Sequence, residues 1–217
     1  MATYNYDRVR LYASQMVDHI GLENLYTKEN HKYPNAPANY FLGNYELLIH
    51  FLKNHLEEIG TPKKIHIIDR RNVEHLIGMY ANMPENIYIN LGEKLNECWR
   101  RFTIIKEICS AYVGHYQNEI RNNIIYEGET NYIRSVEEAF WNKVTYINEE
   151  GLREGDLDSE TFAILLATEL MVPASYKEIT KAYIKQVDEG KLALNDVAKS
   201  LLMPESVLKF YRLKGLL

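Results

Sequence analysis

The stretch Trp99–Tyr116, WRRFTIIKEICSAYVGHY, decides how this chain folds. Its apolar residues recur at helical spacing and share one face: Phe102, Ile105, Cys109, Tyr112, Val113 and Tyr116. A helix with such a stripe must bury it against another element. A second stretch, Thr161–Val172, is apolar nearly all round and ends at Pro173. It predicts a helix at the centre of the core, against which the first helix packs.

Three short runs ahead of the first helix are rich in β-branched and aromatic residues. They are Lys64–Asp69, His75–Ala81 and Asn86–Leu91, and turn residues separate them. Asn82–Glu85 predicts a hairpin connection between the second run and the third. We expect a small three-stranded sheet with one face covered by helices.

The rest of the chain is predicted to be mostly helical. Helices are expected over residues 5–27 (ending near Gly21), Tyr45–Ile59, Ser135–Ile147 and three short tail segments split near Gly190 and Met203-Pro204. The polar stretch Lys28–Asn39 predicts a loop. The fold class is therefore α+β, with an N-terminal helical region (1–62), a core (63–175) and a helical tail (176–217). No strong linker separates these regions, so we expect one compact unit.

The composition narrows the classes of function. The chain has 217 residues, 25 Lys and Arg against 30 Asp and Glu, and a net charge of −5, which argues against nucleic acid as the main partner. No stretch approaches the roughly 18 apolar residues of a membrane span, and no signal peptide is recognisable. We expect a cytoplasmic protein whose two cysteines, Cys98 and Cys109, are free thiols.

Tyrosine is unusually frequent, with 17 residues against 6 phenylalanines. A tyrosine can pack its ring against the core while its hydroxyl stays in water, so the many tyrosines are explained as half-exposed residues at the boundary of the core. The alternative is a dedicated aromatic binding surface.

Four segments resemble the ImmA/IrrE family of zinc metallopeptidases. Arg101–Ser110, RFTIIKEICS, resembles the family's RFTxxHExxH helix. Asn86–Asn90 lies where the family has the edge strand of its sheet, Glu169–Pro173 resembles the ELLMP end of the next core helix, and Leu194–Leu216 resembles the closing helical stretch. The resemblance spans roughly residues 63–217 and implies a zincin-like fold.

The departures from the family pattern fall on the residues that would hold the metal. HExxH brings two imidazoles to one Zn²⁺, and its Glu acts as general base on the metal-bound water. Here Lys106 and Ser110 stand at the two histidine positions, and only Glu107, at the base position, survives. An ammonium has no lone pair, and a neutral hydroxyl is a poor zinc ligand. Phe162 falls at the register of the third, acidic ligand, two residues after Glu160. We therefore expect vestigial metal-ligand positions and neither metal nor cofactor.

The remaining polar residues near this segment do not rebuild the site. His115 lies eight residues after Glu107, about 12 Å of helix rise, so the two cannot chelate one ion. Glu160 and His115 are candidates for lining a cleft. Lys106 is expected to pair with Glu107 or Glu160, so that a cation replaces the lost zinc; a plain surface ion pair is the alternative.

The resemblance implies an origin among proteins that cleave or engage helix-turn-helix repressors, often in phages or mobile elements. The leading hypothesis is a pseudoenzyme, a non-catalytic metallopeptidase-like protein that binds and regulates a protein partner such as a helix-turn-helix regulator. Two alternatives stay open. One is an active zinc metallopeptidase with an atypical site that cleaves a regulatory protein. The other is a DNA-associated regulator that uses the helical tail, against which the acidic balance argues.

Overall fold

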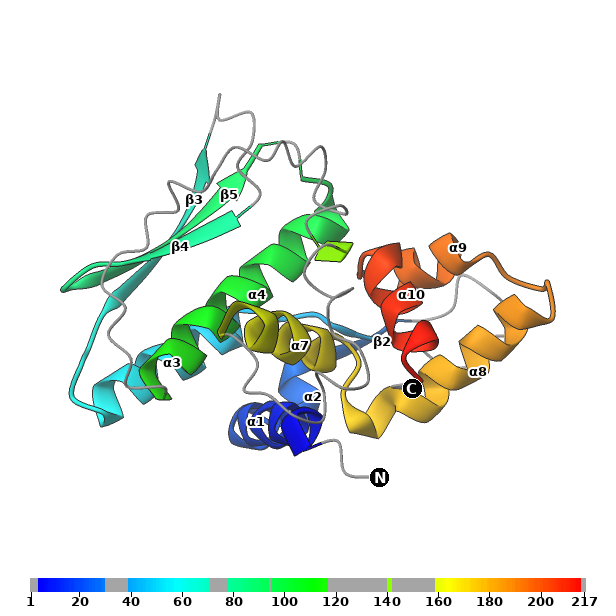
Figure 1. Ribbon diagram of the computed structural model, residues 1–217, viewed down its shortest axis with the longest axis horizontal. Coiled ribbons are helices and arrows are strands. Elements are labelled where there is room, and N and C mark those ends of the chain that lie inside the picture. The colour runs from blue at the N-terminus through cyan, green and yellow to red at the C-terminus, as the bar shows by residue number, and fades with distance from the viewer. Residues whose placement is uncertain are drawn as a thin grey trace.

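The computed structural model describes residues 4–29, 39–70, 78–93, 95–116, 140–141 and 159–215. Its helices are α1 (Tyr4–Ile20), α2 (Leu22–Leu25), α3 (Glu46–Glu58), α4 (Glu97–Tyr116), α7 (Ser159–Met171), α8 (Lys177–Asp188), α9 (Leu194–Ser200) and α10 (Glu205–Leu213), with a 3-10 turn at Ala174–Tyr176. Its strands are β1 (Tyr26–Glu29), β2 (Asn39–Leu42), β3 (Lys64–Arg70), β4 (Gly78–Asn82) and β5 (Asn86–Gly92). The architecture is a mostly helical α+β fold with a three-stranded mixed sheet and C-terminal helices (Figure 1).

Helix α7 occupies the centre of the molecule. Every residue from Thr161 to Val172 is buried, as expected for a helix without a polar face. Helix α4 packs along α7, and α1 covers it from another side (Figure 1). The apolar stripe of α4 is buried from Phe102 to Val113, with Ile105 and Cys109 fully inaccessible. The packing of these two helices, predicted from their sequences, is confirmed.

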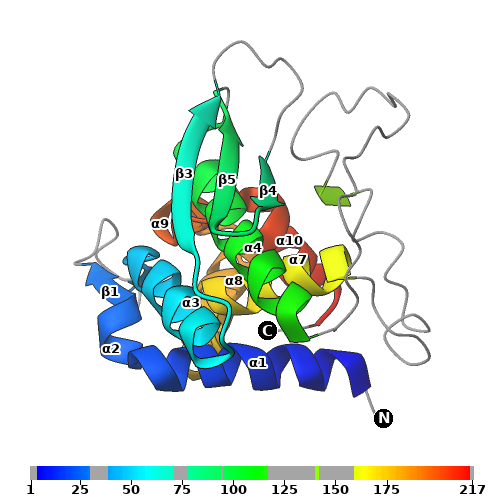
Figure 2. The same cartoon turned by 90° about the vertical axis from the view of Figure 1, so that its left-hand side faces the viewer.

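The three-stranded sheet has the order β3-β5-β4. Strand β3 runs parallel to β5, and β4 runs antiparallel to β5 through the predicted hairpin. The expectation that Asn86–Asn90 forms the sheet edge is wrong, because β5 is the central strand (Figure 2). Its Ile87, Ile89 and Leu91 are fully buried, so the most apolar strand takes the most covered position.

Strand β4 approaches α4 closely at a glycine. A Cβ atom at Gly78 would lie 2.1 Å from Cγ2 of Thr103 and 3.2 Å from Oε1 of Glu107. Only glycine therefore allows this strand to lie so near the helix. This contact brings the sheet edge to the residues that the sequence singled out.

The N-terminal region differs from the sequence-based expectation. Gly21 has φ 89°, in the left-handed region that favours glycine, and the predicted end of the first helix near this residue is confirmed, because α1 ends at Ile20. The difference lies after Gly21, where the short helix α2 and the strand β1 follow. Strands β1 and β2 pair antiparallel at the two ends of the predicted loop Lys28–Asn39. The three short tail helices are confirmed as α8, α9 and α10. Of the helix expected over Ser135–Ile147, only residues 140 and 141 lie within the described part of the chain.

The buried apolar side chains form one cluster that runs from Tyr6 in α1 to Tyr211 in α10. It includes residues from all three predicted regions. No helix in the described ranges is both long enough and apolar enough to cross a membrane. Cys98 and Cys109 are free thiols, and Cys109 is fully buried.

Replacing Ile105 by alanine should lower the free energy of unfolding by about 2–4 kcal/mol, since it leaves a cavity between α4 and the core. Urea denaturation followed by circular dichroism measures this loss. The control is Leu11→Ala on α1, where the side chain is 56% exposed. The control should change stability by less than about 0.5 kcal/mol, and an equal loss in both variants would contradict the packing.

Candidate functional site

Lys106 of α4 lies between two carboxylates. Its Nζ is 2.9 Å from Oε1 of Glu107, the next residue, and 2.6 Å from Oε1 of Glu160 in the first turn of α7. The exposed fractions of the three side chains are 13% for Lys106, 2% for Glu107 and 41% for Glu160. Both carboxylates named from the sequence as candidate partners are therefore brought to Lys106.

The surroundings of Lys106 keep it charged. Burial by itself lowers the pKa of the ammonium, but Glu107 and Glu160 outweigh burial, so the pKa is raised above its usual value. Burial raises the pKa of the Glu107 carboxyl, and the Lys106 charge offsets only part of that effect. The cluster combines one ammonium with two carboxyl groups, one of them fully enclosed.

Tyr80 of β4 is a residue of this site that sequence reasoning missed. Its backbone N–H donates a hydrogen bond to the Glu107 carboxylate. Burial, followed by the charges of Glu107 and Glu160, raises the pKa of its hydroxyl. A Cβ at Gly114 of α4 would lie 3.3 Å from that hydroxyl oxygen. The predicted strand His75–Ala81 contains Tyr80, but nothing in the sequence indicated that this strand would lie over Glu107.

The other predicted positions are not drawn into this ion cluster. The Ser110 hydroxyl is buried and has no hydrogen-bond partner in the part of the chain that the structure describes. Phe162 packs its ring edge-on against Tyr12 of α1, with ring centroids 5.6 Å apart. Two residues correspond to about 200° around a helix, so Glu160 reaches Lys106 from the side of α7 opposite to Phe162. The side chain of His115 lies outside the described residues.

The donor set at Lys106 does not fit a zinc ion. Lys106 and Ser110 offer no zinc-binding donor pair, and Glu107 is already engaged by an ammonium and a backbone amide. Among the described residues, no three His, Cys, Asp or Glu side chains come together in a metal-binding arrangement.

Catalysis by the side chains alone is not supported either. Lys106 is held protonated by two carboxylates, so it cannot take a proton from Ser110. Glu107 is 2% exposed and has no open side towards a substrate water. The arrangement joins α4, α7 and β4.

A second buried cluster surrounds Glu169, near the other end of α7. Lys177 Nζ lies 2.9 Å from Oε1 of this carboxylate and 3.0 Å from Oε2. The hydroxyls of Tyr6 and Tyr211 donate to Oε2 at 2.7 and 3.3 Å. Burial, aided by the Glu169 charge, raises the pKa of both hydroxyls, while burial lowers the pKa of Lys177 in spite of that charge. Sequence reasoning noted Glu169 but missed its partners, which come from α1, α8 and α10.

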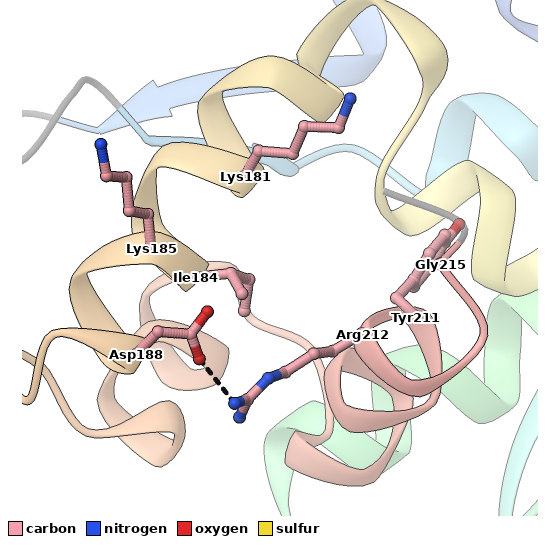
Figure 3. A pocket seen from close by; sticks show the side chains of 7 residues that line it. All are labelled: Lys181, Ile184, Lys185, Asp188, Tyr211, Arg212 and Gly215. Carbon is pink, nitrogen blue, oxygen red and sulfur yellow. Dashed lines mark ion pairs between the residues drawn. The ribbon is translucent and has the colours of Figure 1, made fainter.

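A cavity of about 200 Å³ lies between α8 and α10. It is lined by Lys181, Ile184, Lys185, Asp188, Tyr211, Arg212 and Gly215. Figure 3 shows the Arg212–Asp188 ion pair, of 2.5 Å, on one side and the two lysines on the other. Lys181 is paired with Glu178 at 2.7 Å. Two of the three cations are thus already neutralised, and the cavity lies in the C-terminal helices, apart from the Lys106 cluster (Figure 1).

Replacing Lys106 by methionine should cost about 3–5 kcal/mol at neutral pH, because it leaves a buried carboxylate without its cation. The deficit should shrink as the pH falls. Without the ammonium, the pKa of Glu107 in the native state rises further above its value in the unfolded state. At a pH between these two pKa values the native state binds more protons than the unfolded state, so lowering the pH stabilises the native state. Urea denaturation at about pH 7.5 and about pH 5.5 measures this trend.

Two further variants make the Lys106→Met result specific. Lys181→Met breaks the pair with Glu178, whose side chains are 46% and 82% exposed, and should cost under about 1 kcal/mol with no such pH trend. The double variant Lys106→Met/Glu107→Gln removes the enclosed charge together with its partner and should recover much of the loss. A deficit that does not change with pH would contradict the charge argument.

Comparisons of the chain with protein-family models, curated proteins and solved structures find no match. They assign no family to it. The resemblance of Arg101–Ser110 to the ImmA/IrrE helix therefore remains a hypothesis, and so does the idea that the Lys106 cluster stands where that family holds zinc.

Proposed function

We propose that this protein is a non-catalytic, zincin-like relative of the ImmA/IrrE peptidases that binds and regulates a protein partner without cutting it. The observation that carries the proposal is the Lys106 ammonium, held between Glu107 and Glu160 at 2.9 and 2.6 Å. The resemblance puts zinc at this place, and a tethered cation without a lone pair can replace the charge of zinc but not its chemistry. Regulatory proteins of the helix-turn-helix class are the partners that the resemblance favours.

Strand β4 is the element best suited to receive such a partner. It is an edge of the sheet in the described part of the chain, and an extended segment can add to an edge by backbone hydrogen bonds. The amide of Met83 donates a hydrogen bond to the carbonyl of Asn86 at 2.8 Å. Successive backbone amides of a strand point to opposite sides, so the amide of Asn82, one residue earlier, points away from β5. The Tyr80 amide, which also points away from β5, is occupied by Glu107.

Exposed side chains beside this edge supply further contact area. Met79 and Met83 are each 48% exposed. Methionine is flexible and polarisable, so such residues adapt to partners of different shape. Together with the backbone edge of β4 they form a surface for an extended segment.

The purified protein should contain no tightly bound transition metal. Elemental analysis of protein prepared without chelators should find far less than one zinc per chain, because Lys106 occupies the place of a ligand. Adding a chelator should leave the melting temperature unchanged. About one zinc per chain, with destabilisation by the chelator, would establish the metallopeptidase alternative instead.

Partner capture should depend on the backbone of β4. In pull-downs from the native host, Asn82→Pro removes the outward amide and should weaken capture. Asn82→Ala is the matched control, because it loses the same side-chain contact with Lys63 but keeps the amide. Circular dichroism checks that both variants fold. Equal capture by the two variants would rule out β4 as the docking edge.

The mass of the captured protein separates binding from cutting. Recovery of an intact partner, by wild type and by Glu107→Ala alike, supports the binder. Fragments that disappear with Glu107→Ala would mean that the protein is a peptidase.

A further inference from the structure

The sheet has an outer face that is directed away from α4. Strand alternation turns Ile87, Ile89 and Leu91 of β5 towards α4, and the intervening positions face the other way. The register of the three strands places these residues on the outer face: Lys64, His66, Ile68 and Arg70 of β3, Asn86, Tyr88 and Asn90 of β5, and Met79 and Ala81 of β4. The described helices lie on the opposite side of the sheet (Figure 1). Lys64, His66, Arg70 and Met79 are exposed.

The charge of this face is opposite to that of the whole chain. The chain carries a net charge of −5, yet none of the nine outer-face residues is Asp or Glu. Lys64 and Arg70 mark its two ends, six residues apart along β3, which is about 20 Å. Arg70 is oriented by Asn90, whose Oδ1 accepts a hydrogen bond from its Nε at 2.7 Å. That bond uses one of the five guanidinium N–H donors.

Two stacked rings lie between the cations. His66 of β3 and Tyr88 of β5 are neighbours in the register, and their ring centroids are 5.1 Å apart at an interplanar angle of 20°. Asn86 Oδ1 lies 3.0 Å from Nε2 of His66, which fixes the ring on the sheet surface. The His66 side chain is exposed, so a flat group can stack on this pair.

We infer that this face binds single-stranded nucleic acid. Aromatic rings on a sheet stack unpaired bases, and flanking cations bind the phosphates of a strand. A second copy of the chain would bring two cationic faces together, which the shared charge disfavours. A duplex would offer no free base to the His66–Tyr88 stack. The outer face borders the β4 edge at Met79, but its cations and stacked rings lie on β3 and β5, so nucleic-acid binding does not depend on the protein partner.

Fluorescence anisotropy with labelled oligonucleotides tests the inference. The probes are thymidine and uridine homopolymers of about 15 nucleotides, an abasic strand of the same length, and a duplex. Binding should be tighter to the homopolymers than to the abasic strand or the duplex. It should weaken between roughly 50 and 200 mM salt.

The outer-face variants separate stacking from charge. Tyr88→Ala should weaken binding by roughly fivefold to a hundredfold, whereas Tyr88→Phe keeps the ring and should retain the affinity. Lys64→Ala/Arg70→Ala should lower the dependence of log affinity on log salt concentration by about 1.4, the value for two phosphate contacts on a single strand. Lys181→Ala/Lys185→Ala removes the same charge from α8 and should leave that dependence unchanged.

The outcomes are decisive either way. No binding of the homopolymers at low salt would overturn the inference. So would equal affinity for the abasic strand, tighter binding of the duplex, or an equal effect of the two double variants, because each points to diffuse charge and not to this face. The melting temperature of every variant, compared with wild type, shows whether a loss reflects unfolding.

Discussion

The constraint on which this structure depends is that α7 has no polar face. A helix buried on every side must be surrounded, so α1, α4 and β2 pack around it, and side chains of α8 and α10 reach it at Glu169. Its only two carboxylates, Glu160 and Glu169, stand near its two ends. Each is paired with one lysine, Lys106 from α4 and Lys177 from α8. The apolar middle of α7 supplies the packing, and the two ion clusters fix its neighbours.

The Lys106 cluster holds three elements of the fold together. Glu107 accepts bonds from the Lys106 ammonium and the Tyr80 amide, so it joins α4 to the sheet. Burying an ion pair carries a desolvation cost that attraction only roughly balances, and such pairs are best understood as fixing an arrangement.

The sequence predicted features that depend on local periodicity. The stripe of α4, the apolar run of α7, the β4–β5 hairpin and the tail helices all follow from spacing within a short window. The pairing of Lys106 with a carboxylate was also predictable, because an unpaired ammonium at a buried position is costly. Each of these predictions depended either on residues close in sequence or on one large energetic cost, that of burying an unpaired charge.

The features that sequence reasoning missed depend on contacts between distant residues. The central place of β5 is set by its pairing with β3, which local alternation does not reveal. Strands β1 and β2 are short, and β1 has only one buried residue, Tyr26, among those whose burial is described, so no apolar alternation marked it. Tyr80 and the partners of Glu169 come from elements whose relative position only the fold determines.

The Glu169 cluster has a consequence for how the chain is made. The acceptor of the Tyr6 hydroxyl, Glu169, lies 163 residues later in the chain, and Tyr211 follows 42 residues after that. The buried hydroxyl of α1 therefore has no acceptor until residue 169 has been made, and contacts of such separation close slowly. A nascent chain released before residue 177 would contain the Glu169 carboxylate without its cation. Two helices separated by more than 180 residues of chain, α1 and α10, thus meet at a single buried oxygen atom, Oε2 of Glu169.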